Sequence, residues 1–154
     1  MKLRTILSTA LVLGLSCTLP GAAQDRGNWR PVSKTAQSIT GDLVISGERL
    51  SMNFYTFPIA EIRPLKPEEV LAAFDTADAN AGSGHLYRLS IPGDKRFLHK
   101  NTLCGSEETQ WMATYVSGKG LGIIFFSNAF PPVFTTEALT NSVNLCGTFS
   151  YTRR

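Results

Sequence analysis

The sequence predicts a mainly β protein, a small antiparallel β-barrel or sandwich of seven or eight strands with one short helix and one disulfide bond. Three observations predict this fold: short segments in which apolar and polar residues alternate, turn residues between these segments, and two cysteines late in the chain. Alternation with a period of two is typical of strands that bury one face. Short strands at close spacing favour a barrel or a sandwich.

The expected strands follow from this alternation. Leu50, Met52 and Phe54, for example, fall on one face of a segment whose intervening residues are polar. The expected strands span residues 38–46, 49–54, 59–63, 86–91, 110–117, 121–127 and 145–152. Glycine-containing turns at 46–48, 92–94 and 118–120 separate neighbouring strands.

One segment carries the signals of a helix instead. Pro67 is followed by two glutamates, and proline and acidic residues are typical of the first turn of a helix. We expect this helix to reach Phe74 and to plug one end of the barrel. Residues 76–84, rich in Ala, Gly, Asn and Asp, then predict a flexible loop. A single helical turn is expected at 135–139.

The first 23 residues have the parts of an export signal. Lys2 and Arg4 form a basic start, residues 6–19 form an apolar run, and Pro20–Ala23 supplies the small residues at which a signal peptidase cleaves. We therefore expect a signal peptide at 1–23. Residues 24–154 should then form a single β-rich domain in the bacterial periplasm.

Membrane attachment has two open alternatives. The apolar run is too short to cross a membrane and no second run of about 20 apolar residues follows, so the mature chain should have no transmembrane span. Cys17 leaves open a lipid anchor of the bacterial lipoprotein type. An outer-membrane barrel is the other alternative, although its strands should run about 9–11 residues and the expected strands are shorter.

Composition and charge exclude some classes of protein. Hydrophobic residues make up 43% of the chain and the mean hydropathy is −0.01, as in globular proteins. The formal charge of +3 falls to about +1 once Lys2 and Arg4 are removed. Nucleic-acid binding needs a clustered basic face, and the sequence shows none, so no nucleic-acid partner is expected.

The two cysteines that remain after export predict one disulfide. Cys104 and Cys146 would face an oxidising compartment, where such a pair is usually bonded. Two buried free thiols are the alternative. Closing a loop of this length contributes up to about 4 kcal/mol in the chain-entropy description.

No motif specifies a chemistry, so we predict no catalytic residue, no metal site and no cofactor. His85 and His99 have no partner at a metal-ligand spacing and are expected to be structural or surface histidines. Asp75 and Asp78 are expected to be solvated charges. Residues 118–122 look faintly like a phosphate-binding loop, but their position between two strands favours a hairpin turn.

The long connection at 128–144 carries the tentative binding residues Phe130, Pro131, Pro132 and Phe134. The two prolines restrict the backbone and so reduce the entropy lost on binding. Large rings on a stiff loop commonly act as interface anchors. The competing interpretation is that both rings fold back and cap the barrel as part of its core.

Three segments resemble a group of small secreted proteins of alphaproteobacteria. Residues 101–105 (NTLCG) match an N-x-L-C-G segment, residues 145–151 (LCGTFSY) match a closing L-C-G-T-F/Y-x-Y strand, and residues 38–42 accompany them. The resemblance covers most of the mature chain. It implies a bacterial periplasmic setting and supports the pairing of Cys104 with Cys146, but it implies no activity.

The expected function is that of a periplasmic, non-enzymatic binding or inhibitor-like module whose partner is an envelope protein or a small apolar ligand. The alternative is a structural or stress-protective envelope protein without a specific ligand, and an enzyme of unrecognised type is a third hypothesis. An open, aromatic interior would favour a small ligand. A filled core with an exposed Phe-Pro loop would favour a protein partner, and a surface without an apolar patch would favour the structural protein.

Overall fold

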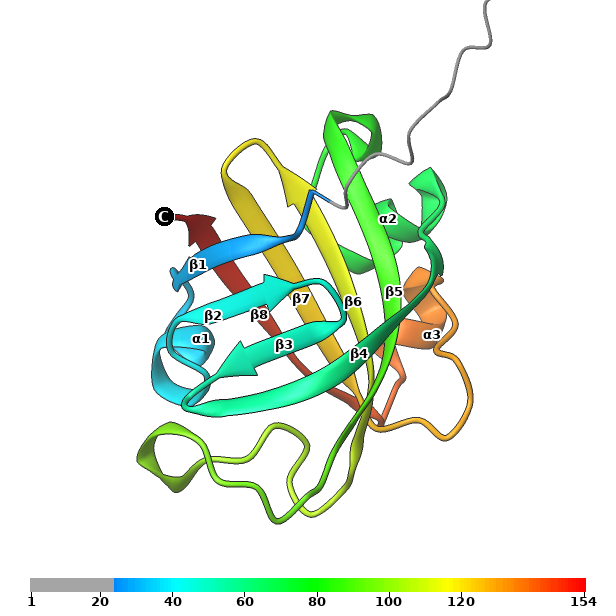
Figure 1. Cartoon of the computed structure of the whole chain (residues 1–154). Coiled ribbons are helices and arrows are strands. Elements are labelled where there is room, and N and C mark those ends of the chain that lie inside the picture. The colour runs from blue at the N-terminus through cyan, green and yellow to red at the C-terminus, as the bar shows by residue number, and fades with distance from the viewer. Residues whose placement is uncertain (1–23) are drawn as a thin grey trace, which may run out of the picture.

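A computed structural model describes residues 24–154, which form one closed barrel of eight antiparallel strands (Figure 1). Each strand pairs with the next along the chain, and the last strand closes the barrel against the first. The strands are β1 Gly27–Pro31, β2 Leu43–Ser46, β3 Arg49–Met52, β4 Tyr55–Pro64, β5 Gly82–Ile91, β6 Thr109–Ser117, β7 Gly120–Phe126 and β8 Leu145–Arg153. The expected signal peptide and Cys17 lie outside the described residues.

The predicted fold class is confirmed, with three differences in the N-terminal part of the barrel. The expected strand at 49–54 ends at Met52, so Phe54 lies in the turn to β4. Strand β1 was not expected, because its five residues bury only Trp29 deeply and show little alternation. The expected strand at 38–46 is wrong in its first half. Lys34–Ile39 forms helix α1, which Ser33 caps by accepting a hydrogen bond from the Ala36 amide at 3.2 Å.

Inward-pointing side chains fill the barrel. Phe125 of β7 and Phe149 of β8 meet edge to face, with ring centroids 5.3 Å apart, near the middle of this core. The largest fully buried side chains of the inner core are Trp29, Phe125, Phe149, Leu43, Ile45, Leu50, Met52, Ile91, Met112 and Leu121. Inner and outer residues alternate along each strand, so the apolar residues of the alternating pattern point into this core.

A second apolar cluster lies on the outer face of β5, β6 and β7. Helix α2 (Pro67–Ala73) packs Val70 against this cluster, close to Gly84, where an added Cβ would lie 3.1 Å from Val70 Cγ2. The helix is therefore confirmed, but its expected place is wrong, because it covers the barrel wall and does not plug an end. The strand residues of this cluster are Leu86, Trp111, Ala113, Tyr115, Ile124 and Phe126.

The end of the barrel at which β1 finishes is closed by α1 and by residues 92–108. Ala36 of α1 is fully buried in the inner core, and the hydroxyls of Thr40 and Tyr151 are 2.6 Å apart. The predicted disulfide is present: Cys104 bonds to Cys146, with Cα atoms 4.8 Å apart, and so ties this closing segment to the start of β8.

The stretch 76–84, expected to be a flexible loop, is regular structure from Ala79 onward. A short 3-10 helix, η1, spans Ala79–Ala81, and β5 begins at Gly82. A Cβ on Gly82 would lie only 1.8 Å from the carbonyl oxygen of Val116 on β6. Glycine is required there by the close approach of two backbones.

Candidate functional site

The interior of the barrel is solid, which decides where a binding site can lie. Trp29, Leu50 and Met112 have no exposed surface, and they belong to one continuous core. Interiors packed in this way have little room for a ligand. The candidate sites are therefore the recesses and exposed side chains on the outer surface, together with one buried polar cluster at a barrel end.

The structure separates the two rings that the sequence placed in the loop 128–144. Phe134 is 5% exposed and packs edge to face on Phe126 of β7, with centroids 5.8 Å apart. Phe130 is 83% exposed. Of the two prolines, Pro132 is buried and Pro131 is exposed. Phe134 thus belongs to the outer apolar cluster, whereas Phe130 is free to contact a partner.

The loop is held at its base and along its second half. The Trp111 indole donates a hydrogen bond to the carbonyl oxygen of Asn128 at 3.1 Å, and the Ser127 amide donates to the carbonyl of Asn144 at 2.9 Å. Helix α3 (Thr136–Thr140) confirms the expected helical turn, and Thr135 caps it. These contacts, with buried Phe134, give the loop a defined shape.

Exposed apolar side chains gather on this loop. Val133 is 64% exposed and Val143 is 93% exposed, in addition to Phe130. A recess of about 290 Å³ lies between the proline segment and the residues of and after α3, and Val133 and Val143 line it. Glu137 is the one charged residue between positions 128 and 144. The loop therefore offers an almost uncharged surface on which exposed apolar side chains lie beside polar, uncharged ones such as Asn141 and Ser142.

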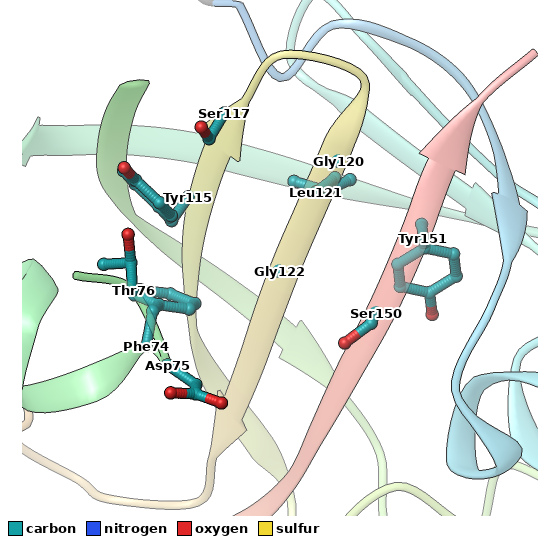
Figure 2. Close-up of a pocket in the computed structure, with 10 residues that line it drawn as sticks. All are labelled: Phe74, Asp75, Thr76, Tyr115, Ser117, Gly120, Leu121, Gly122, Ser150 and Tyr151. Atoms are coloured by element: carbon teal, nitrogen blue, oxygen red, sulfur yellow. The ribbon is translucent and has the colours of Figure 1, made fainter. Parts of the chain in front are cut away.

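A second recess lies on the outer wall between residues 74–76 and strands β6 to β8 (Figure 2). Its volume is about 370 Å³. The ring of Phe74 lies over Gly122, where a Cβ would be 2.9 Å from Phe74 Cδ1, and the Tyr115 hydroxyl donates to the Asp78 carbonyl at 2.9 Å. The other lining residues are Asp75, Thr76, Ser117, Gly120, Leu121, Ser150 and Tyr151. The lining has no histidine, cysteine or lysine, so it supplies no imidazole, thiol or amine for catalysis.

A buried carboxylate that the sequence did not reveal lies where β1 begins. Asp25 is 1% exposed, and its Oδ2 accepts hydrogen bonds from the Tyr87 hydroxyl at 2.7 Å and the Thr114 hydroxyl at 2.8 Å. His85 Nδ1 lies 3.6 Å from the same oxygen, and His85 Nε2 lies 3.8 Å from Glu61 Oε1. A buried carboxylate is stable only when paired in this way.

Burial and the neighbouring charges shift the pKa values of Asp25, His85 and Tyr87. Burial alone would raise the pKa of the Asp25 carboxyl, but His85 and the two hydroxyl donors outweigh it and hold that pKa below its usual value of 3.8. The Asp25 carboxylate in turn raises the pKa of the His85 imidazole above 6.5, against the opposing effect of burial. Burial and the nearby carboxylate raise the pKa of Tyr87 far above its usual range. The geometry favours an ion pair of Asp25 with protonated His85.

This cluster fastens the N-terminal segment onto the barrel. The Trp29 indole donates to the Asp25 carbonyl at 2.7 Å, and the Arg153 guanidinium donates to the carbonyls of Gln24 and Arg26 at 2.6 and 3.1 Å. The same guanidinium lies over the Trp29 ring, 4.4 Å from its centroid. The cluster therefore has a clear structural role. His85, expected to be a structural or surface histidine, is part of it, while His99 is exposed.

Comparison with known proteins leaves the geometry as the only guide to function: no protein family, no curated protein and no solved structure matches this chain. Between residues 24 and 154, no helix is long and apolar enough to cross a membrane. Within the same range, no group of three histidine, cysteine or acidic side chains is placed to hold a metal ion. The fold and its surface thus define a closed eight-stranded antiparallel barrel with a filled core and an apolar loop.

Proposed function

We propose that this protein is a non-enzymatic binding or inhibitor-like module of the bacterial periplasm, and that it binds a folded envelope protein through the loop 128–144. The observation that carries the proposal is that one phenylalanine of this loop is buried and the other is exposed. Phe134 fixes the loop on the barrel wall, and Phe130 stands almost fully exposed. A large ring on a loop that is already ordered loses little entropy when a partner covers it.

The filled interior supports a protein partner over a small apolar ligand. A barrel that stores such a ligand keeps an inner cavity for it, whereas side chains occupy the space inside this barrel. Full burial of an exposed phenylalanine contributes about 1.5–3 kcal/mol. Phe130 is therefore suited to act as the apolar anchor of a small interface. Val133 and Val143, which line one recess of the same loop, add further exposed apolar surface.

The periplasmic location belongs to this proposal. The basic and apolar segments at the start of the sequence are typical of export. The disulfide between Cys104 and Cys146 is typical of an oxidising compartment. The partner is accordingly expected among proteins of the envelope.

The test is site-specific cross-linking followed by mass spectrometry. A photo-reactive phenylalanine analogue at position 130 of the full chain, expressed in its native host, should trap one protein partner on illumination. The complex should be weakened when Val133→Ser and Val143→Ser are added, because these residues carry the other exposed apolar side chains of the loop. The same analogue in place of Leu71, which is 51% exposed on α2, is the matched control and should trap nothing specific.

Two substitutions separate binding from stability. Phe130→Ala should leave the melting temperature within about 2 °C of wild type, because surface substitutions change stability by less than about 0.5 kcal/mol, and should abolish capture. Phe134→Ala removes a core ring and should lower stability by about 3–5 kcal/mol. If no partner is trapped at position 130 in a correctly folded protein, the binding proposal is wrong. The alternative of a structural or stress-protective envelope protein then becomes the better account.

A further inference from the structure

Backbone strain gathers at one end of this barrel. Among residues 24–154, four non-glycine residues have positive φ angles: Asn53 at 47°, Phe54 at 67°, His99 at 54° and Lys100 at 62°. Asn53 and Phe54 form the turn between β3 and β4, while His99 and Lys100 follow Leu98 in the segment that closes the same end. Strained residues persist where the surrounding structure enforces them, and they concentrate at functional surfaces.

Phe54 is the least expected of the four residues. It occupies the second position of a two-residue turn whose flanking residues, Met52 and Tyr55, pair directly. Glycine is strongly preferred there, because a Cβ is crowded at positive φ. The side chain of Phe54 is 105% exposed, so it packs against nothing that would offset the strain. Folding alone therefore gives no reason for phenylalanine at this position.

A hollow lies beside this ring. It has a volume of about 370 Å³ and is lined by Phe54 and Leu98 on its apolar sides. The remaining lining residues are Thr40, Gly41, Asp42 and Asn53. Gly41 has φ of +63°, and a Cβ there would lie 3.1 Å from Leu98 Cδ1, so Leu98 is held close to the chain after α1. Such a hollow is large enough for one large side chain of a partner.

Contacts between the neighbouring segments hold the residues that line the hollow. Tyr55 meets Phe97 edge to face with centroids 5.8 Å apart, and the ammonium of Lys95 lies 5.1 Å from the centroid of the Tyr55 ring. The Asn101 side chain donates to the Ser38 carbonyl at 3.0 Å. These contacts join the hairpin, α1 and the closing segment, so the surface is formed before any partner arrives.

Cations outnumber carboxylates in the chain that follows and precedes Leu98. Arg96 and Lys100 are exposed two residues to either side of Leu98, and Lys95 lies next to Asp94, the one carboxylate of residues 92–100. Asp42 is the one charged residue of the lining, and it forms an ion pair with Arg154, which compensates its charge. A positive rim around an apolar hollow complements a chain that carries carboxylates on both sides of an apolar residue.

We propose that this surface, formed by residues 53–54, 40–42 and 96–100, binds an acidic peptide segment whose large apolar side chain enters the hollow between Phe54 and Leu98. Its carboxylates would face Arg96 and Lys100. This surface shares no residue with the loop 128–144, so the two binding proposals can be tested independently. A role as one wall of the peptide site gives a reason for phenylalanine at this strained, exposed position.

The probe is a random dodecapeptide library displayed on phage. The target is the protein purified from the periplasm of a bacterial host that expresses the full chain, and the Phe54→Gly variant serves for counter-selection. Selected peptides should carry at least two acidic residues next to an aromatic residue or leucine. As synthetic peptides they should bind at least about tenfold more weakly to Phe54→Gly, which removes one wall of the hollow, and to Lys100→Glu, which reverses a charge beside it. Phe130→Ala should leave their binding unchanged.

Stability provides the second readout. Phe54→Gly should melt about 2–4 °C above wild type, because it removes backbone strain from the turn. Gain of stability together with loss of peptide binding would support the proposal. Three results would overturn it: no peptide enriched over the counter-selection, selected peptides without acidic residues, or Phe54-dependent sedimentation with vesicles of phosphatidylglycerol in the absence of peptide binding. The last result would assign the surface to a membrane.

Discussion

The buried carboxylate of Asp25 should be among the most important single groups for the stability of this barrel. Its Oδ2 accepts two hydroxyl hydrogen bonds and lies beside His85, and none of these groups is well exposed. A hydrogen bond to a charged group contributes on the order of 1.5–3 kcal/mol. Asp25→Ala leaves the hydroxyls of Tyr87 and Thr114 buried without this acceptor, so we expect a loss of about 3–5 kcal/mol.

The expected change in melting temperature follows from the size of the domain. With an unfolding entropy of about 2.1 cal/mol/K per residue, residues 24–154 lose roughly 3.6 °C for each kcal/mol, so Asp25→Ala should melt about 10–18 °C below wild type. Differential scanning calorimetry at about pH 5.5, where Asp25 and His85 are both charged, measures this shift. Asp94→Ala, at an exposed carboxylate, is the matched control and should melt as wild type does. A shift below about 3 °C for Asp25→Ala would refute the assignment of this cluster as a major stabilising contact.

Three further outcomes are expected. Because the pKa of His85 is raised on folding, its protonated form stabilises the barrel below the unfolded value of 6.5, and this contribution is lost as the pH rises through the folded pKa. The melting temperature of wild type should thus exceed that of His85→Gln by more at about pH 5.5 than at about pH 9, and a constant difference would contradict the ion pair. The double variant Cys104→Ser, Cys146→Ser should lose about 2–4 kcal/mol in denaturant titrations, whereas an unchanged midpoint would show that the bridge does not stabilise the fold. Gly82→Ala should lose more than about 2 kcal/mol of unfolding free energy in the same assay, because its Cβ would clash with the Val116 carbonyl. Gly47→Ala has a positive φ but no neighbour within 4 Å and should lose about 1 kcal/mol. Equal losses in the two variants would argue against the clash.

The candidate surfaces could be predicted from local sequence signals only in part. Prolines and aromatic residues in one stretch were enough to single out the loop 128–144. They could not decide which ring is free, because that depends on whether Phe126 of a neighbouring strand lies beneath Phe134 or beneath Phe130. Phe54 was expected on the buried face of a strand, since Leu50, Met52 and Phe54 alternate correctly. The chain turns after Met52 instead, and Phe54 emerges at the hairpin tip with its side chain in solvent.

Most of the barrel could be predicted from the sequence, because alternation along a strand is a local property. Strands β3 to β8 and the helix that begins at Pro67 follow from residue types and short spacings. The Cys104–Cys146 bridge follows from the number of cysteines that remain after the expected export. Closure of the barrel, the place of α2 on its wall and the meeting of Asp25 with Tyr87 and Thr114, 62 and 89 residues further along the chain, required the tertiary structure. Such contacts depend on strand register and on the path of the whole chain, which no local pattern records.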